Sequence, residues 1–183
     1  MKLTGVLVTA GLCATSVAAC EPATPSPERA DVQVGETSAT NPIAAPSCAA
    51  DQLTGTLEPG SPGAGQRYAT LVLTNKSGPA CTVDGYGDLR LADADDTALP
   101  TDSWREPDPA PTPVVLAQGD AAQRELHWTV VRAPEEPADG PCQPEPERLE
   151  VTPPDRAGLI PVPWSFGPVC QHGWLGGGAY TAR

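Results

Sequence analysis

Apolar and polar residues alternate with a period of two along several short stretches, and one of the longest runs from Tyr68 to Thr74. Ala69, Leu71 and Leu73 share one side of this alternation, and threonine, tyrosine and valine occupy the other. Period two in β-branched and aromatic residues predicts a β-strand. The segment Asn75–Pro79 ends it, because Gly and Pro suit a turn and fit a central strand poorly. We expect everything after Cys48 to pair with this strand or to pack on it.

The same alternation predicts further strands at Gln52–Glu58, Asp88–Ala92, Val114–Leu116, Gln123–Val131, Arg148–Thr152 and Leu159–Trp164. Three antiparallel hairpins are expected from consecutive pairs: the first strand with Tyr68–Thr74, Val114–Leu116 with Gln123–Val131, and Arg148–Thr152 with Leu159–Trp164. The segment 100–113 is polar and Pro-rich and predicts a surface crossover. The Gly-rich tail 173–183 predicts at most a weak edge strand. About seven or eight short strands without a helical stripe predict an all-β, immunoglobulin-like two-sheet sandwich over residues 48–183.

The composition argues against a mainly helical fold and against a nucleic-acid-binding protein. The 183 residues include 23 Pro and 18 Gly, which argues against a mainly helical chain. The four Trp, three Tyr and one Phe leave the core to Leu, Val and Ala. The formal charge of −12 argues against a nucleic-acid partner, which needs basic patches, and favours solubility of an exported domain.

The N-terminus has the pattern of an export signal. Met1-Lys2 is positive, Leu3–Val17 is an apolar stretch too short to span a bilayer, and the residues before Cys20 are small. This pattern resembles a bacterial lipobox, which implies cleavage after residue 19 and a lipid anchor on Cys20. Ordinary secretion with an unmodified Cys20 is the alternative. We expect residues 1–19 to be a signal peptide and the chain to sit on the extracytoplasmic face of the cell membrane.

Residues 20–47 are rich in Pro, Ala, Ser and Thr and show no apolar periodicity. Such a segment buries too little surface to offset its conformational entropy, so we expect a disordered tether that spaces the domain from the membrane.

The cysteines after the tether are Cys48, Cys81, Cys142 and Cys170. Four cysteines allow three pairings, and loop entropy does not choose among them. Strand geometry favours Cys48–Cys81 and Cys142–Cys170, because each pair brackets the open end of a predicted hairpin. Zinc ligation by these four lacks a C-x-x-C pair and conflicts with an oxidising exterior.

Several segments together resemble one family. The segments are Tyr68–Asn75, Gly78–Val83, Leu126–Thr129, Pro141–Pro144, Leu149–Pro153 and Pro168–Cys170. They are similar to the signature of domain of unknown function 4232, an actinobacterial family typically carried on secreted proteins or lipoproteins. The resemblance covers most of residues 48–170 and implies the fold and the cysteine positions. It implies no activity and no catalytic residue.

Candidate chemical sites are few. His127 lies opposite Leu126 and Trp128 in its strand, with no nucleophile placed beside it by a recognisable motif, and His172 reads as a loop residue. The aspartates of segment 93–96 could bind Ca²⁺, but aspartates at a turn usually bond the local backbone. Trp164 reads as core. Trp104, beside Arg105 in the predicted crossover, is either an exposed contact anchor or a residue folded back onto the sandwich.

These observations favour a non-catalytic, lipid-anchored domain that binds a protein or a cell-envelope glycan, without a metal or cofactor. Two alternatives stay open. One is an envelope spacer or assembly subunit without a discrete ligand, and the other is an unrecognised hydrolase that uses His127.

Lipid attachment is expected to depend on Cys20 alone. The Cys20→Ser variant should remain uncleaved at this site and should not incorporate a fatty-acid probe, because the thiol that accepts the lipid group is gone. Labelling in growing cells followed by mass spectrometry of the N-terminal peptide measures both effects. Lipid incorporation by the variant would contradict the lipobox interpretation.

Overall fold

The computed structural model describes residues 44–156 and 158–183, which form eleven strands, one 3₁₀ helix and one short α-helix. The strands are β1 (Leu53–Pro59), β2 (Gln66–Asn75), β3 (Cys81–Val83), β4 (Asp88–Ala92), β5 (Asp102–Arg105), β6 (Val114–Leu116), β7 (Ala121–Thr129), β8 (Arg148–Thr152), β9 (Ile160–Pro163), β10 (Trp174–Gly177) and β11 (Thr181–Ala182). The 3₁₀ helix η1 (Ala50–Gln52) leads into β1, and α1 (Cys170–Gly173) leads into β10. No helix among the described residues is long and apolar enough to cross a membrane.

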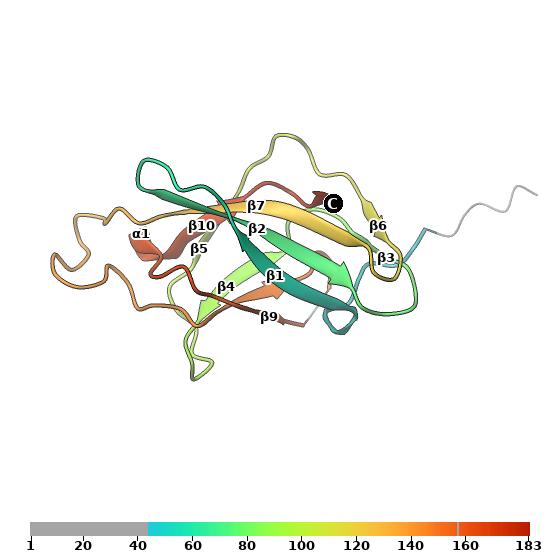
Figure 1. Cartoon of the computed structure of the whole chain (residues 1–183), viewed down its shortest axis with the longest axis horizontal. Helices are drawn as coiled ribbons and strands as arrows, with labels where there is room; N and C mark the ends of the chain where they lie inside the picture. Colours follow the sequence, from blue (N-terminus) through green and yellow to red (C-terminus); the bar gives the residue numbers. More distant parts are fainter. Residues whose placement is uncertain (1–43, 157) are drawn as a thin grey trace, which may run out of the picture. The chain divides into compact units, whose positions relative to one another are not determined.

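The larger sheet has the strand order β1-β2-β7-β10-β5, and β11 also pairs with β7 (Figure 1). Strand β2 pairs antiparallel with β1 on one side and with β7 on the other. The strand predicted at Tyr68–Thr74 therefore holds the central position expected of it. Strand β10 pairs antiparallel with β7 and parallel with β5.

The second layer consists of the sheet β4-β8-β9 and the pair β3-β6. The predicted hairpin of Arg148–Thr152 with the following strand is present as β8 and β9, which pair antiparallel. Residues from both layers form one core, in which the Trp128 ring of β7 lies 4.8 Å from the Trp164 ring of the second layer. The predicted core position of Trp164 is thus confirmed, and the chain is an all-β sandwich.

Two disulfides close the domain at the predicted pairs. Cys48 joins Cys81 with a Cα–Cα separation of 4.8 Å, and Cys142 joins Cys170 with a separation of 5.4 Å. The backbone N–H of Cys48 also donates to the carbonyl of Thr82 at 2.9 Å, which places the first bridge beside β3. Disulfides persist in oxidising compartments, so the pair of bridges indicates an extracytoplasmic location.

The predicted hairpin of Val114–Leu116 with Gln123–Val131 is wrong. Strand β6 pairs with β3 in the second layer, whereas β7 belongs to the larger sheet. The buried side-chain amide of Asn75 donates to the carbonyl of Leu116 at 3.0 Å, which holds the end of β6 beside the end of β2. The carbonyl of Asn75 accepts from Gly119 N–H at 2.8 Å, so the turn is bonded to the end of β2. The chain changes layers at this turn.

Three strands were not expected where they occur, and the first is β3 at Cys81–Val83, for which no strand was predicted. The predicted crossover 100–113 contains β5, and the predicted weak edge strand of the tail is the inner strand β10. The described residues therefore form more strands than the seven or eight expected. The larger sheet ends at β5, which contains Trp104.

The packed domain begins slightly before Cys48. The carbonyl of Pro46 accepts from Thr82 N–H at 2.8 Å, and the carbonyl of Ala45 accepts from the Thr82 hydroxyl at 3.0 Å. The last residues assigned to the tether thus hydrogen-bond to β3. The predicted signal peptide, Cys20 and the predicted tether up to residue 43 lie outside the described residues.

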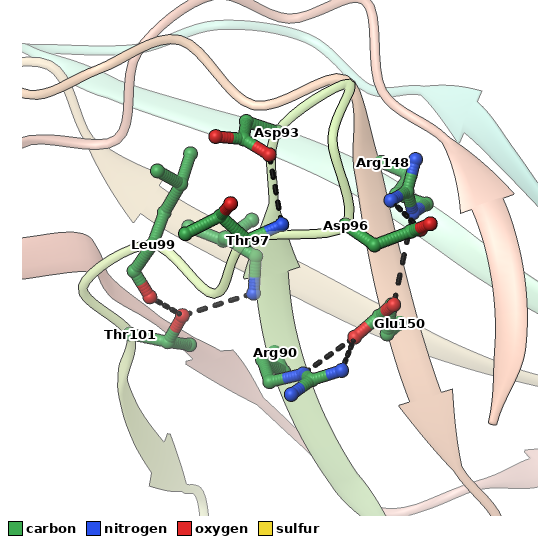
Figure 2. A network of polar contacts seen from close by, with 9 residues as sticks. Arg90, Asp93, Asp96, Thr97, Leu99, Thr101, Arg148 and Glu150 are labelled. Atoms are coloured by element: carbon green, nitrogen blue, oxygen red, sulfur yellow. Dashed lines mark hydrogen bonds and ion pairs between the residues drawn. The ribbon is translucent and has the colours of Figure 1, made fainter. Parts of the chain in front are cut away.

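A polar network joins β4, β8 and the turn between β4 and β5 (Figure 2). The buried carboxylate of Glu150 accepts from Arg90, and its other oxygen lies 3.6 Å from Nε of Arg148. Arg148 also pairs with Asp96 of the turn. Within that turn, the carboxylate of Asp93 accepts from the N–H groups of Asp95 at 3.0 Å and Thr97 at 2.8 Å. The predicted bonding of a turn aspartate to the local backbone is confirmed for Asp93.

Removal of the buried carboxylate should cost more stability than removal of the exposed one. Glu150→Ala should lower the free energy of unfolding by about 1.5–3 kcal/mol, because a charge-assisted hydrogen bond to Arg90 and an ion pair with Arg148 are lost in a covered site. Asp96→Ala should cost less than about 1 kcal/mol, because that side chain is 80% exposed. Urea denaturation of both variants measures the difference. Equal losses would show that the Glu150 pairs contribute no more than surface ion pairs.

Candidate functional site

Strand pairing places an aromatic row across the outer face of the larger sheet. Tyr68 of β2 lies opposite His127 of β7, His127 lies opposite Gly176 of β10, and Gly176 lies opposite Trp104 of β5. Directly opposed residues share a face of a sheet, as do residues two apart in one strand. Trp174 therefore joins the same face. We call Tyr68, Trp104, His127 and Trp174 the aromatic patch.

The rings of the aromatic patch are in mutual contact. The Trp104 and Trp174 rings stack with centroids 5.0 Å apart and an interplanar angle of 17°. His127 lies 4.5 Å from Trp104 and 5.4 Å from both Trp174 and Tyr68. All four side chains are half-buried. Nε1 of Trp104 is covered and has no hydrogen-bond partner among the described residues, so the exposed part of that indole is carbon.

Glycines of the tail make this packing possible. A β-carbon at Gly176 would lie 2.1 Å from the carbonyl oxygen of Trp104 and 2.9 Å from Cδ1 of its ring. A β-carbon at Gly177 would lie 2.1 Å from the carbonyl oxygen of Glu125. Only glycine lets β10 approach β5 and β7 this closely. Trp104 of β5 reaches His127 of β7 because β10, which lies between these two strands, carries no side chain at Gly176.

His127 is held in its neutral form at neutral pH. Burial among the rings lowers its pKa from the ordinary value, and this effect outweighs the opposing influence of the carboxylates of Glu125 and Glu106. The aromatic patch therefore carries no positive charge of its own near pH 7.

A cavity of about 440 Å³ continues the outer face beyond the aromatic patch. Thr70 and Glu125 line it, and they are opposed residues two positions along β2 and β7 from Tyr68 and His127. Two positions along a strand correspond to about 7 Å, so the cavity adjoins the aromatic patch. Gln123 and Thr181 add polar groups, and the loop 109–112 forms the opposite wall. The volume is within the range of about 300–1,000 Å³ found for small-molecule sites.

A buried cation supports the sheet from its inner face. Arg124 of β7 donates to the carbonyls of Tyr86 and Gly177, and its guanidinium lies 5.5 Å from the centre of the Tyr180 ring. Burial lowers the pKa of Arg124 and raises the pKa of Tyr180. The bond to Gly177 links β7 to the end of β10, so Arg124 positions the strand that carries Trp174 and lies next to Trp104 of β5.

The structure separates the two residues predicted as a contact pair. Trp104 belongs to the aromatic patch, whereas Arg105 donates to Asp88 at 2.9 Å and lies over the Tyr86 ring. The predicted orientation of His127, opposite Leu126 and Trp128, is confirmed by their burial. Sequence reasoning did not connect Tyr68 and Trp174 with Trp104. The alternation of Tyr68–Thr74 and of the strand containing His127 could have placed two aromatic side chains on one outer face.

The Cys142–Cys170 bridge lies beside a buried carboxylate. Glu136, Cys142 and Cys170 bring an oxygen and two sulfurs within 4.8 Å of one another, but the disulfide occupies both sulfurs. Burial raises the pKa of Glu136, yet hydrogen bonds from Gln143, Ala133 and the Gln171–His172 backbone lower it by more. His172 is exposed, and its Nδ1 lies 3.8 Å from Glu135. The Glu136 carboxylate thus connects the loop that contains it to α1 through hydrogen bonds.

The fold and the outer face together define an all-β sandwich domain with an aromatic patch beside a polar cavity. Comparison of sequences places this domain in a family. The model of the family described as "Domain of unknown function (DUF4232)" matches residues 48–181, and the chain belongs to that family. No curated protein and no solved structure matches the chain.

The close approach of β10 yields a test of the aromatic patch. Gly176→Ala should lower the free energy of unfolding by about 1–3 kcal/mol, because the new methyl group overlaps the Trp104 backbone and ring. Gly178→Ala is the matched control and should change stability by less than about 0.5 kcal/mol, because no atom lies within 4 Å of its β-carbon position. Denaturation monitored by tryptophan fluorescence measures both variants. Equal tolerance of the two substitutions would contradict the described packing of β5 on β10.

Proposed function

We propose that this chain is a non-catalytic binding module, held on the extracytoplasmic face of the membrane by a lipid on Cys20. Its β-sandwich carries the binding surface, and its partner is a protein or a glycan of the cell envelope. The observation that carries the proposal is the aromatic patch on the outer face of the larger sheet. Half-buried tryptophan and tyrosine side chains are enriched where proteins bind partners.

The outer face has the two components of a recognition site. The aromatic patch offers apolar area, and the adjoining cavity offers the hydroxyl, amide and carboxylate groups of Thr70, Gln123 and Glu125. Binding sites commonly combine an aromatic lining with a few polar groups that fix orientation. Both components are on paired strands of one sheet, which supplies a rigid support.

The surroundings of His127 favour binding over catalysis. General-base catalysis needs a nucleophile or water within hydrogen-bond reach and a group that orients the imidazole. The contacts of His127 are instead with the rings of Tyr68, Trp104 and Trp174. A neutral, ring-packed imidazole contributes contact area to a binding surface.

Position-specific photo-cross-linking on intact cells tests the proposal. A photoreactive side chain replaces Thr70, beside the aromatic patch, and a matched one replaces Val115, which is 59% exposed on β6 in the second layer. We expect a discrete adduct from position 70 and none of that kind from position 115. Adding Trp104→Ala should abolish the adduct at position 70, because the apolar contact area is lost.

Digestion of the adduct by proteases or by glycosidases identifies its class. An adduct that persists with Trp104→Ala, or that forms equally from position 115, would contradict binding through the outer face. A complete lack of adducts would favour an envelope spacer without a discrete ligand.

A further inference from the structure

We infer that the partner of the outer face is a neutral polysaccharide, with a sugar ring stacked on the aromatic patch and the adjoining sugar in the cavity lined by Thr70 and Glu125. This inference rests on the proposed function and adds the chemical class of the ligand. It follows from three properties of the outer face: exposed aromatic carbon, a row of hydrogen-bonding side chains, and the sign of its charge.

The aromatic carbon matches the flat face of a pyranose ring. The C–H groups on such a face carry partial positive charge, and the face of an aromatic ring is negative. The covered Nε1 of Trp104 leaves carbon as the exposed part of that indole. The Trp104 and Trp174 rings cover one face of each other, so a sugar would contact the outer surfaces of this stacked pair and the neighbouring His127 ring.

The polar row matches the hydroxyl edge of a sugar. Thr70, Gln123, Glu125 and Thr181 all line the cavity. Threonine hydroxyls and the glutamine amide both donate and accept hydrogen bonds, and the carboxylate of Glu125 accepts from hydroxyl groups. The step of about 7 Å between the Tyr68–His127 pair and the Thr70–Glu125 pair allows one chain of linked sugars to contact both regions.

The charge on the outer face disfavours an anionic ligand. Glu125 lines the cavity, and the carboxylates of Glu125 and Glu106 act on His127. Asp102 pairs with Trp174 in the parallel register, on the same face. Arg124 also lines the cavity, but it is buried and donates to the carbonyls of Tyr86 and Gly177. Arg105 donates to Asp88. A phosphorylated or uronic-acid polymer would meet the carboxylates of this face, while both cations are already engaged by other groups.

The geometry also favours a sugar over a cationic peptide. The Trp104 and Trp174 rings lie 5.0 Å apart in a near-parallel stack, which leaves no space for a cation between them. The patch lies on the face of a sheet whose strands β7 and β10 are paired on both sides, so a peptide cannot extend the sheet there. A ligand that stacks from above and hydrogen-bonds through its edge fits this surface.

A glycan array tests the inference directly. The full chain, purified from membranes in detergent and fluorescently labelled, is applied to an array that carries neutral, anionic and amino-sugar glycans together with lysine-rich peptides. We expect saturable binding to a subset of the neutral glycans. Affinity for those glycans should change less than about twofold between low and high salt, because no ion pair forms in the complex.

Variants then locate the bound glycan. Trp104→Ala and Trp174→Ala should each weaken binding at least about tenfold, because each removes a stacking ring. Gln123→Ala should weaken it about three- to tenfold through a lost hydrogen bond. Val115→Ala is the control outside the site and should bind as the unchanged chain does. Melting temperatures of all variants separate a loss of contact from a loss of folding.

Three outcomes would overturn the inference. Binding confined to lysine-rich peptides, lost in high salt and in Glu125→Gln, would identify a cationic partner. Glycan binding unaffected by both tryptophan variants would place the glycan elsewhere. An array without bound glycans, combined with a protein adduct from position 70, would reject the glycan and leave the proposed binding role intact.

Discussion

The close approach of β10 to its two neighbours is the constraint on which the outer face depends. Backbone atoms of β5 and β7 lie where β-carbons would be at Gly176 and Gly177, and at Gly173 a β-carbon would lie 1.9 Å from the carbonyl oxygen of Pro100. Three glycines thus fit a strand tightly between two others. Because β5 joins the sheet only through β10, the same glycines place Trp104 in the row with His127 and Tyr68. A larger residue in this strand would separate the rings that form the aromatic patch.

Contacts on the inner face and in the second layer, together with the disulfides, hold β10 and its neighbouring strands in place. On the inner face, Arg124 donates to the carbonyl of Gly177 and holds the end of β10 against β7. In the second layer, Glu150 joins the arginines of β4 and β8, and Arg148 extends this network to the turn that precedes β5. The disulfides add covalent links at Cys48–Cys81 and next to α1, directly before β10. The position of the outer face is therefore set by contacts made largely on other surfaces of the domain.

Much of the fold could be predicted from the alternation of apolar and polar residues. Strong period-two segments such as Tyr68–Thr74 and Asp88–Ala92 are strands, and the cysteines that bracket predicted hairpins are the ones that pair. The alternation did not predict strands whose position depends on the strands they pair with rather than on their own residue pattern. Gly176 and Gly177 read as breakers, yet their lack of side chains is what an inner strand needs here. The pairing of β6 with β3 joins segments about 30 residues apart, and the bond from Asn75 to Leu116 spans 41 residues, so neither leaves a local signal.

The candidate site was partly visible in the sequence. His127 has the predicted orientation, and Trp104 is in the aromatic patch, but Arg105 is turned toward Asp88 because adjacent residues of a strand face opposite sides. Trp104 and Trp174 are far apart in the sequence and meet only through the parallel pairing of β5 with β10. Local sequence patterns do not predict this pairing, because parallel strands are joined by long connections.

The central claim is that the outer face of the larger sheet is where this chain binds its partner. Nuclear magnetic resonance mapping on the full chain, titrated with the neutral glycan that binds best on the array, tests it most directly. We predict that the largest shifts fall on the indole N–H of Trp174, the ring of His127 and the backbone of Thr70 and Glu125. Shifts confined to the β4-β8-β9 sheet or to the β3-β6 pair would contradict the account.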